Sequence, residues 1–164
     1  EMMHSKRVSQ LCEELAIKMN LDSELVNKYR MAGLVHDIGK IGIDEKILNS
    51  SERLTAEEWN EIKKHPEIGY RILSSASEYT EVAGFVLEHQ EKWDGSGYPK
   101  GLKGENISLG ARIIAVADAY DAMTSKRTYS VIKSHQEALE EIERGSGSQF
   151  DPEIVKIFIN SQLA

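Results

Sequence analysis

The sequence predicts an all-α protein, and three observations support this fold class. Hydrophobic residues recur at helical spacing along most of the 164-residue chain. No segment shows the alternation of hydrophobic and polar residues that is typical of a half-buried strand. Pairs of residues that start helices occur twice, as Thr55 with Glu58 and as Ser134 with Glu137. We therefore expect a bundle of about seven helices, interrupted mainly by a glycine-rich stretch within residues 87–101.

The first half of the chain contains the first four predicted helices. The first helix has one hydrophobic face, formed by Val8, Leu11, Leu15 and Met19. The chain then breaks at Asn20, and Asp22 is the expected cap of a second helix that ends near the stretch HDIGKIG. The Thr55 pair opens a third helix that runs through Ile62. Pro66 suits the first turn of a fourth helix.

The hydrophobic pattern predicts four further helices in the second half of the chain. Residues 79–91 form one helix, with His89 near its end. The stretch SLGARIIAVADAYDAMTS is the most hydrophobic helix of the chain, and Ser134 begins the next one. The last helix starts at Asp151-Pro152-Glu153, where a capping residue, a proline and an acid stand in the expected order.

Composition limits the class of protein. A chain of 164 residues suits one domain with a hydrophobic core, and 40% hydrophobic with 29% charged residues indicates a globular protein. No hydrophobic run approaches the roughly 20 residues that span a bilayer, and the polar first residues do not resemble a signal peptide. The single cysteine, Cys12, suits a reducing compartment. We expect a cytoplasmic domain without membrane contact, and the net charge of −7 disfavours duplex nucleic acid as a partner.

Histidines are the first candidates for chemistry. Four of the five lie on or at the end of a predicted helix, next to hydrophobic positions: His4, His36, His65 and His89. One such histidine is more often a hydrogen-bonded core residue, but four of them with carboxylates favour a metal site. His36 stands beside Asp37, and burial of both would require a partner such as a metal. The alternative for this pair is a helix-end histidine and a capping aspartate.

Two aspartates in the most hydrophobic helix extend this set. Asp118 and Asp121 lie three residues apart, so they share similar but not identical faces. We expect one to point toward a metal and the other toward a cap or a basic residue; the alternative is two solvated acids. Histidines and carboxylates together suit a two-metal hydrolytic site, although no spacing matches a compact zinc motif such as H-E-x-x-H.

Seven segments together resemble the HD-GYP family. They are HSKRV at 4–8, LVHDIGKIGI at 34–43, LTAEEW at 54–59, HPEIGYRIL at 65–73, HQEKWDGSGYPKGL at 89–102, ARIIAVADAYDAMTSKRTY at 111–129 and FDPEIV at 150–155. The resemblance implies an all-α HD-superfamily bundle with a GYP loop, as a single domain over residues 1–164. The abrupt start of the chain suggests a domain taken from a longer regulatory protein. Active members of the family hydrolyse the bacterial messenger cyclic di-GMP to pGpG and often to GMP.

The resemblance also implies a ligand set for two divalent metal ions, with Fe or Mn favoured and Zn or Ni as alternatives. The first metal would take His4, His36, Asp37 and Asp118, and the second would take His65 and His89, with Asp37 bridging the two. Water activated by both metals would attack phosphorus. The resemblance implies that Asp37 and Lys40 are the catalytic residues.

Further residues would bind the cyclic dinucleotide. Lys40 would contact the substrate phosphate or the leaving oxygen, and Arg127 would reach a phosphate. Gly97, Tyr98 and Pro99 match the triplet that names the family and would shape the ligand groove, with Tyr98 near a guanine. Without the motif, an exposed helix-end lysine would be the preferred interpretation of Lys40. A packing or capping tyrosine would be an equally good interpretation of Tyr98.

Three departures from the family pattern leave other functions open. Gln90 stands where many active members have histidine, and the position of the glutamate that some members place four residues before the first histidine falls before Glu1. Ser130 replaces a cation, for which Lys126 or Lys133 could substitute. A second hypothesis is therefore a weak or silent domain that binds a nucleotide, a protein partner or a second copy of itself. A third is an HD phosphohydrolase that acts on another nucleotide.

Overall fold

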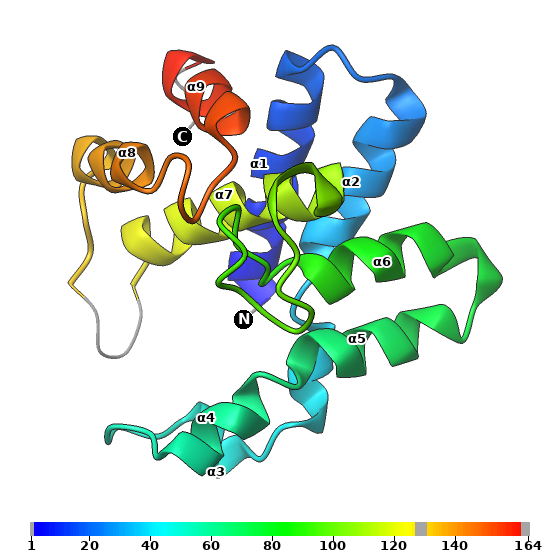
Figure 1. Ribbon diagram of the computed structural model, residues 1–164, viewed down its shortest axis with the longest axis vertical. Coiled ribbons are helices and arrows are strands. Elements are labelled where there is room, and N and C mark those ends of the chain that lie inside the picture. Colours follow the sequence, from blue (N-terminus) through cyan, green and yellow to red (C-terminus); the bar gives the residue numbers. More distant parts are fainter. Residues whose placement is uncertain (1, 127–130, 162–164) are drawn as a thin grey trace.

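The computed structural model describes residues 2–126 and 131–161, and this part of the chain is all-helical, with one isolated backbone bridge between Ser146 and Phe150 (Figure 1). The α-helices are α1 (Met2–Lys18), α2 (Ser23–Val35), α3 (Glu45–Leu48), α4 (Ala56–Ile62), α5 (His65–Ser74), α6 (Thr80–Glu88), α7 (Leu109–Thr124), α8 (His135–Arg144) and α9 (Pro152–Ser161). The turns of 3-10 helix are η1 (Ile38–Gly42), η2 (Ser77–Tyr79) and η3 (Gly104–Asn106). The predicted all-α fold is confirmed, and α3 and α4 are the short α-helices of the described chain.

The predicted helix starts carry the expected hydrogen bonds. The side chain of Asp22 accepts from the backbone N–H of Leu25, which satisfies one free donor in the first turn of α2. Thr55 and Ser134 each form a complete capping box, with Glu58 at α4 and with Glu137 at α8. Local sequence therefore fixes where these helices begin.

The helix predicted over residues 79–91 is shorter than expected. It occupies Thr80–Glu88 as α6, and His89 stands at its C-terminal cap. Beyond that point the N–H of Glu91 bonds to the carbonyl of Glu88, three residues back, which is a turn and not a continued α-helix. The side chain of Glu91 binds the following loop instead, and this contact offsets the loss of one helical turn.

Helix α7 forms the centre of the molecule. It crosses the middle of Figure 1 and contacts α1, α2, α6, α8 and α9. Ile113, Ile114, Val116 and Ala117 are fully buried. Neighbours on several sides explain why this helix is hydrophobic around most of its circumference. A carboxylate on such a helix, such as Asp118, is thereby carried into the interior.

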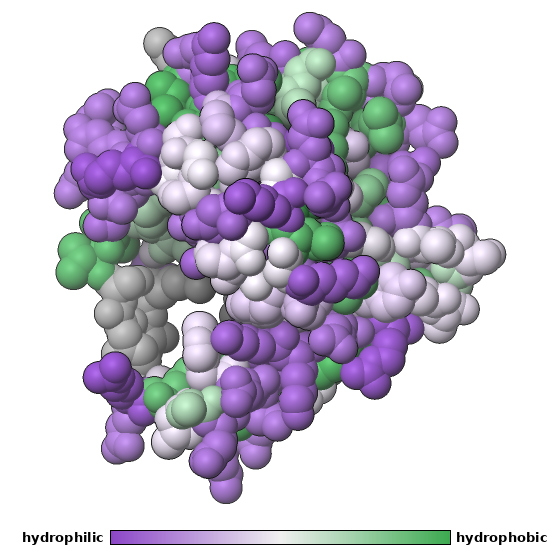
Figure 2. Space-filling model, in the orientation of Figure 1, coloured by the Kyte–Doolittle hydropathy of each residue, from purple (hydrophilic) through white to green (hydrophobic). Residues whose placement is uncertain are grey.

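Helices α3 and α4 form an arm at one end of the bundle. In Figure 1 the arm projects away from α1 and α9, below α5. The face in Figure 2 is covered mainly by hydrophilic side chains with scattered hydrophobic ones, and it is hollowed between the arm and the rest of the molecule. Across residues 2–126 and 131–161, none of the helices has the length and hydrophobicity needed to traverse a bilayer.

Candidate metal centre

Four helices bring the predicted histidines to one place. His4 comes from the first turn of α1, His36 caps the end of α2, His65 begins α5 and His89 caps the end of α6. All four side chains are buried. Residues that lie up to 85 positions apart in the chain, from 4 to 89, therefore share one interior site, and Asp118 joins them from α7.

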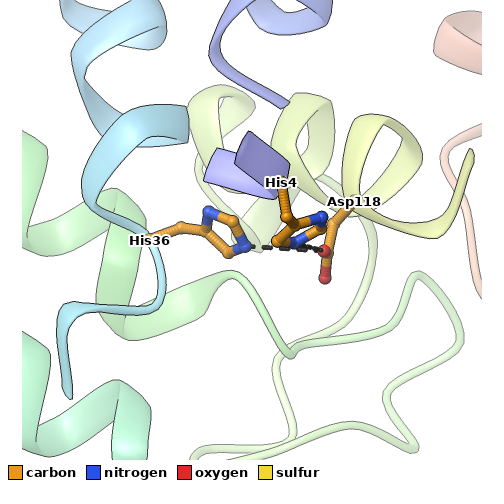
Figure 3. A group of neighbouring side chains, drawn as sticks. All are labelled: His4, His36 and Asp118. Atoms are coloured by element: carbon orange, nitrogen blue, oxygen red, sulfur yellow. Dashed lines mark ion pairs between the residues drawn. The ribbon is translucent and has the colours of Figure 1, made fainter. Parts of the chain in front are cut away.

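The first group consists of His4, His36 and Asp118 (Figure 3). Asp118 Oδ1 lies 3.0 Å from Nε2 of His4 and 3.4 Å from Nε2 of His36. Both Nε2 atoms are buried, and neither has a hydrogen-bond partner among the described residues. Buried polar atoms without partners are costly, so this group has the chemistry of a site that a cation would complete.

The second group consists of Asp37, His65 and His89. Asp37 Oδ1 lies 3.6 Å from Nε2 of His65 and 3.8 Å from Nε2 of His89. In each group the candidate ligand atoms lie within 4.8 Å of one another. Imidazole nitrogens with a carboxylate oxygen form a donor set for zinc or a related transition metal.

Asp37 faces both groups with different oxygens. Its Oδ2 lies 3.2 Å from Nε2 of His36 and 3.8 Å from Nε2 of His4. Its Oδ1 faces His65 and His89 of the second group. One carboxylate thus stands between two candidate metal positions, which is the position that a bridging ligand needs.

Hydrogen bonds fix the direction of three of these rings. Nδ1 of His36, His65 and His89 lies 2.6–2.7 Å from the carbonyl oxygen three residues earlier, on Gly33, Ile62 and Val86 respectively. A carbonyl can only accept, so Nδ1 carries the hydrogen in each ring. The neutral ring then presents an Nε2 lone pair to the centre of the site, as a metal ligand must.

The charges of the two groups differ in the metal-free protein. Burial disfavours the charged form of His36, but Asp37 and Asp118 outweigh it and raise the pKa of His36. Burial likewise disfavours the charged form of His4, but the carboxylates of Asp118 and Asp121 outweigh it and raise the pKa of His4. In the second group burial dominates and lowers the pKa of His65, and that of His89 to about 4.

The carboxylates are held in the ionised form. Burial alone would raise the pKa of Asp37, but the charges of His36 and Lys40 lower it well below the usual range. Burial would also raise the pKa of Asp118, but the nearby rings of His36 and His4 outweigh it and lower this pKa. Ionised carboxylates and unprotonated Nε2 atoms are the forms that bind metal, so the donor set fits divalent cations.

A cavity of about 330 Å³ opens beside the two groups. Its wall includes Lys40, Trp59, Gln90, Tyr98 and Gln149, together with four of the candidate metal ligands: Asp37, His65, His89 and Asp118. Lys40 Nζ lies 3.2 Å from Asp37 Oδ2, because the turn η1 places the lysine three residues after the aspartate. Burial raises the pKa of Tyr98 to about 12, so its hydroxyl stays neutral. The cavity therefore combines anionic, cationic and aromatic groups.

The glycine-rich stretch folds back against the end of α6. The N–H of Tyr98 bonds to the carbonyl of Gln90, and a Cβ atom on Gly97 would lie 2.4 Å from the backbone nitrogen of Lys92. Glycine is therefore required at 97. The buried carboxylate of Glu91 accepts from the N–H groups of two residues beyond the triplet, at 100 and 102. These bonds hold Tyr98 at the cavity wall.

The structure brings together the six predicted metal ligands and places Lys40, Tyr98 and Gln90 at the adjoining cavity. Gly97 and Pro99 shape the loop and are not among the cavity-lining residues described. Lys133 is partly buried after the gap at 127–130, and its N–H bonds to the carbonyl of Met123. The predicted Arg127, and Ser130 with it, lie outside the described residues.

Of the two aspartates on α7, Asp118 is the one that lies among the candidate metal ligands, and Asp121 is not. Asp121 contacts His4 and the basic residue Arg7. Sequence reasoning missed Arg7, Glu91 and the cavity position of Trp59. Two features of the sequence could have indicated these residues. Arg7 lies one helical turn after His4, and Glu91 lies between the end of a helix and the glycine-rich loop.

The chain is similar to known proteins over nearly all of its length. The sequence profile of the HD domain matches residues 2–154. A cyclic di-GMP phosphodiesterase of Thermotoga maritima is 43% identical over 158 residues, which cover 95% of this chain and 43% of the relative. The 3'3'-cGAMP-specific phosphodiesterase 2 of Vibrio cholerae is 37% identical over 158 residues, covering 95% of this chain and 30% of the relative. The chain thus spans less than half the length of these curated relatives.

The fold has counterparts among solved structures. The crystal structure of a cyclic GMP-AMP-specific phosphodiesterase of Vibrio cholerae superposes with a TM-score of 0.77 at 22% identity, covering 96% of this chain and 43% of the other. At this identity the likeness concerns the fold alone. The profile match, the identity to curated relatives and the shared helical architecture lead to one conclusion: the chain belongs to the HD domain family, within its HD-GYP group.

Proposed function

We propose that this domain is a metal-dependent phosphodiesterase that hydrolyses a cyclic dinucleotide, with cyclic di-GMP as the favoured substrate and pGpG or GMP as product. The observation that carries this proposal is the position of Asp37, whose two oxygens face two separate groups of candidate ligands. The names of the relatives support the substrate class. The proposal covers residues 1–164 as one domain.

Two divalent cations are the proposed cofactors. One would be held by His4, His36 and Asp118, the other by His65 and His89, with Asp37 shared between them. Mixed imidazole and carboxylate ligands suit Fe and Mn, and the same set accommodates Zn or Ni. When bound, a pair of such ions lowers the pKa of water and stabilises the charge of a phosphoryl transition state.

Two residues of the chain act directly in the proposed reaction. Asp37 holds an ionised carboxylate between the two groups, and its low pKa keeps that charge at neutral pH. Lys40 lines the cavity 3.2 Å from this carboxylate. Its ammonium would donate hydrogen bonds to a phosphate oxygen and to the leaving oxygen, where negative charge develops.

The cavity wall favours a nucleotide over a simple phosphate ester. Tyr98 contributes an aromatic ring and a neutral hydroxyl, and Trp59 contributes a half-exposed indole from the arm. Aromatic side chains provide stacking surfaces for bases of any sequence. Arg127 remains a proposed phosphate contact from the HD-GYP motif, as do Gly97 and Pro99 as the frame of the loop.

A second candidate function is a nucleotide-binding domain with weak catalysis. Gln90 supports it, because a carboxamide lines the cavity directly after the candidate ligand His89. An amide is a poorer ligand than imidazole for Fe or Mn, so a third metal is not expected here. If this candidate is correct, Gln90→His will raise the bound metal or the rate of hydrolysis.

A substrate panel tests the proposal. The purified chain, loaded anaerobically with Fe²⁺ or Mn²⁺, is incubated with cyclic di-GMP, 3'3'-cGAMP and a linear nucleotide ester, and the products are separated by chromatography. We expect cyclic di-GMP to be hydrolysed fastest and Asp37→Asn to abolish hydrolysis. Preferred hydrolysis of the linear ester would favour another phosphohydrolase activity, and binding without turnover would favour the second candidate.

A further inference from the structure

Two charged residues behind the first metal group take no part in the function proposed above. Asp121 lies one helical turn after Asp118 on α7, and its side chain is 4% exposed. Arg7 lies one turn after His4 on α1, and its side chain is 42% exposed. The two residues are 114 positions apart in the chain, yet they form an ion pair at 2.6 Å.

The carboxylate of Asp121 is held at both oxygens. Oδ1 accepts from Nε of Arg7 at 2.6 Å and from the hydroxyl of Ser125 at 3.1 Å. Oδ2 accepts from Nη2 of Arg7 at 3.2 Å and lies 2.6 Å from Nδ1 of His4. The guanidinium therefore contacts both oxygens, which fixes the plane of the carboxylate.

His4 differs from the other three candidate histidines in this respect. His36, His65 and His89 each direct Nδ1 to a backbone carbonyl, whereas His4 directs Nδ1 to the charged side chain of Asp121. A carboxylate acceptor orients an imidazole and increases its basicity as a metal ligand. The strength of His4 as a ligand thus depends on a side chain that a substitution can change without touching the ligand itself.

We propose that Asp121 and Arg7 are positioning residues that set the metal affinity of the first group by orienting His4. Arg7 acts on Asp121, and Asp121 acts on His4. The inference rests on the proposed metal-binding role of His4, His36 and Asp118. It concerns one of the two groups, because the second group is oriented through backbone carbonyls.

Stepwise titration of the metal-free chain with Mn²⁺, followed by the electron paramagnetic resonance signal of free Mn²⁺, measures both sites in one experiment. Asp121→Asn should weaken one of the two sites about 10- to 100-fold and leave the other unchanged. Arg7→Met should weaken the same site by a smaller factor, about threefold to tenfold, since Asp121 keeps its contact with His4. Arg7→Lys keeps the positive charge but loses the planar guanidinium that contacts both oxygens of Asp121. Its Mn²⁺ affinity should therefore lie between those of Arg7→Met and the wild type.

The double variant tests whether the two residues act in series. If Arg7 acts through Asp121, then Arg7→Met combined with Asp121→Asn should weaken the site no more than Asp121→Asn alone. If the double variant instead weakens Mn²⁺ binding by the product of the two single-variant factors, Arg7 acts independently of Asp121. That result would overturn this step of the inference.

A matched control separates positioning from general loss of stability. Arg112 forms a more deeply buried arginine–aspartate pair with Asp151, with Nη1 2.7 Å from Oδ2, and neither residue belongs to the groups of candidate ligands. Arg112→Met should lower the melting temperature and leave both Mn²⁺ sites unchanged. Equal weakening by Arg112→Met and Arg7→Met, or unchanged Mn²⁺ affinity in Asp121→Asn, would overturn the inference.

The titration also separates this inference from the proposed function. A wild-type chain that binds two Mn²⁺ but hydrolyses no cyclic dinucleotide would contradict the proposed function, and the effect of Asp121→Asn on affinity would still decide the inference. A wild-type chain with no Mn²⁺ site would contradict both, and this outcome is visible in the wild-type titration alone.

Discussion

The Nε2 atoms of His65 and His89 lie 3.2 Å apart, although neither atom carries a hydrogen to donate to the other. Each ring already donates its Nδ1 hydrogen to a backbone carbonyl, on Ile62 and on Val86. Two lone pairs therefore face each other in a buried site, which is unfavourable unless a cation lies near both. The Nε2 atoms of the second group are therefore unprotonated at neutral pH, so a metal can bind there without displacing a proton.

The two metal groups should respond differently to pH. In the metal-free protein the pKa of His4 and of His36 is raised above 6.5, so these rings hold protons that a metal must displace. The affinity of the first group should therefore increase as the pH rises above 6.5. The pKa of His65 and of His89 is lowered, so the second group should be insensitive to pH above 6.5.

Mn²⁺ titrations at several pH values, in buffers of different ionisation enthalpy, measure this difference. Calorimetry should record proton release on binding to one site and almost none on binding to the other. Equal pH dependence at both sites would contradict the assignment of protons to the first group.

Lys40 should matter for turnover and not for metal content. Lys40→Met removes the ammonium that lies beside Asp37 at the cavity, so we expect kcat to fall about 100-fold, as for the loss of one charge-stabilising donor. Lys18→Met, at the exposed end of α1, is the matched control and should leave kcat unchanged. Loss of bound metal in Lys40→Met, measured by elemental analysis, would instead assign the lysine a structural role.

The helices could be predicted from the sequence because capping and hydrophobic spacing are local information, whereas the set of candidate histidines follows from the order of the motifs. Capping residues such as Thr55 and Ser134 act within one turn, and their helices begin where expected. The pattern of hydrophobic residues marks α7 as a central helix. Motif order then indicates which histidines belong together, although no local rule brings His4 to Asp118.

Gly39 should be the less replaceable of the two glycines in the stretch HDIGKIG, at 36–42. A Cβ atom at this position would lie 1.8 Å from the carbonyl oxygen of His65, because η1 packs directly on the start of α5. Gly39→Ala should therefore lower the free energy of unfolding by about 3 kcal/mol, and displace His65. Chemical denaturation together with Mn²⁺ titration measures both effects.

Gly84 provides the matched control in α6. A Cβ atom at Gly84 would meet no atom within 4 Å, so Gly84→Ala should raise the free energy of unfolding by about 0.5–1 kcal/mol. A Gly39→Ala variant as stable as wild type would refute the close packing of η1 against α5.

Glu91 should control the loop and thereby the substrate. Its carboxylate accepts from two backbone N–H groups, and Glu91→Gln would turn an amide NH₂ toward one of them. We expect a loss of about 2 kcal/mol in unfolding free energy and a raised KM, because Tyr98 loses its fixed position. Steady-state kinetics on cyclic di-GMP distinguishes this result from a fall in kcat alone, which would place Glu91 in the chemical step.

The parts that sequence reasoning missed depend on tertiary contacts. The hydrophobic pattern places Glu91 in a helix, but the structure has a turn there, and the loop supplies two donors to the Glu91 side chain. The role of Asp121 follows from Arg7, which lies on another helix 114 positions away. Helical spacing places Asp121 near Asp118 but cannot say which of the two faces the candidate ligands.

Hydrolysis of cyclic di-GMP as a function of metal equivalents per chain tests the central claim most directly. The chain is freed of metal with a chelator and reloaded anaerobically with Fe²⁺ or Mn²⁺ in steps, and products are quantified by chromatography at each step. The proposal that Asp37 serves two metals predicts that hydrolysis rises with binding of the second equivalent. A chain that holds two equivalents and forms no pGpG or GMP would contradict it.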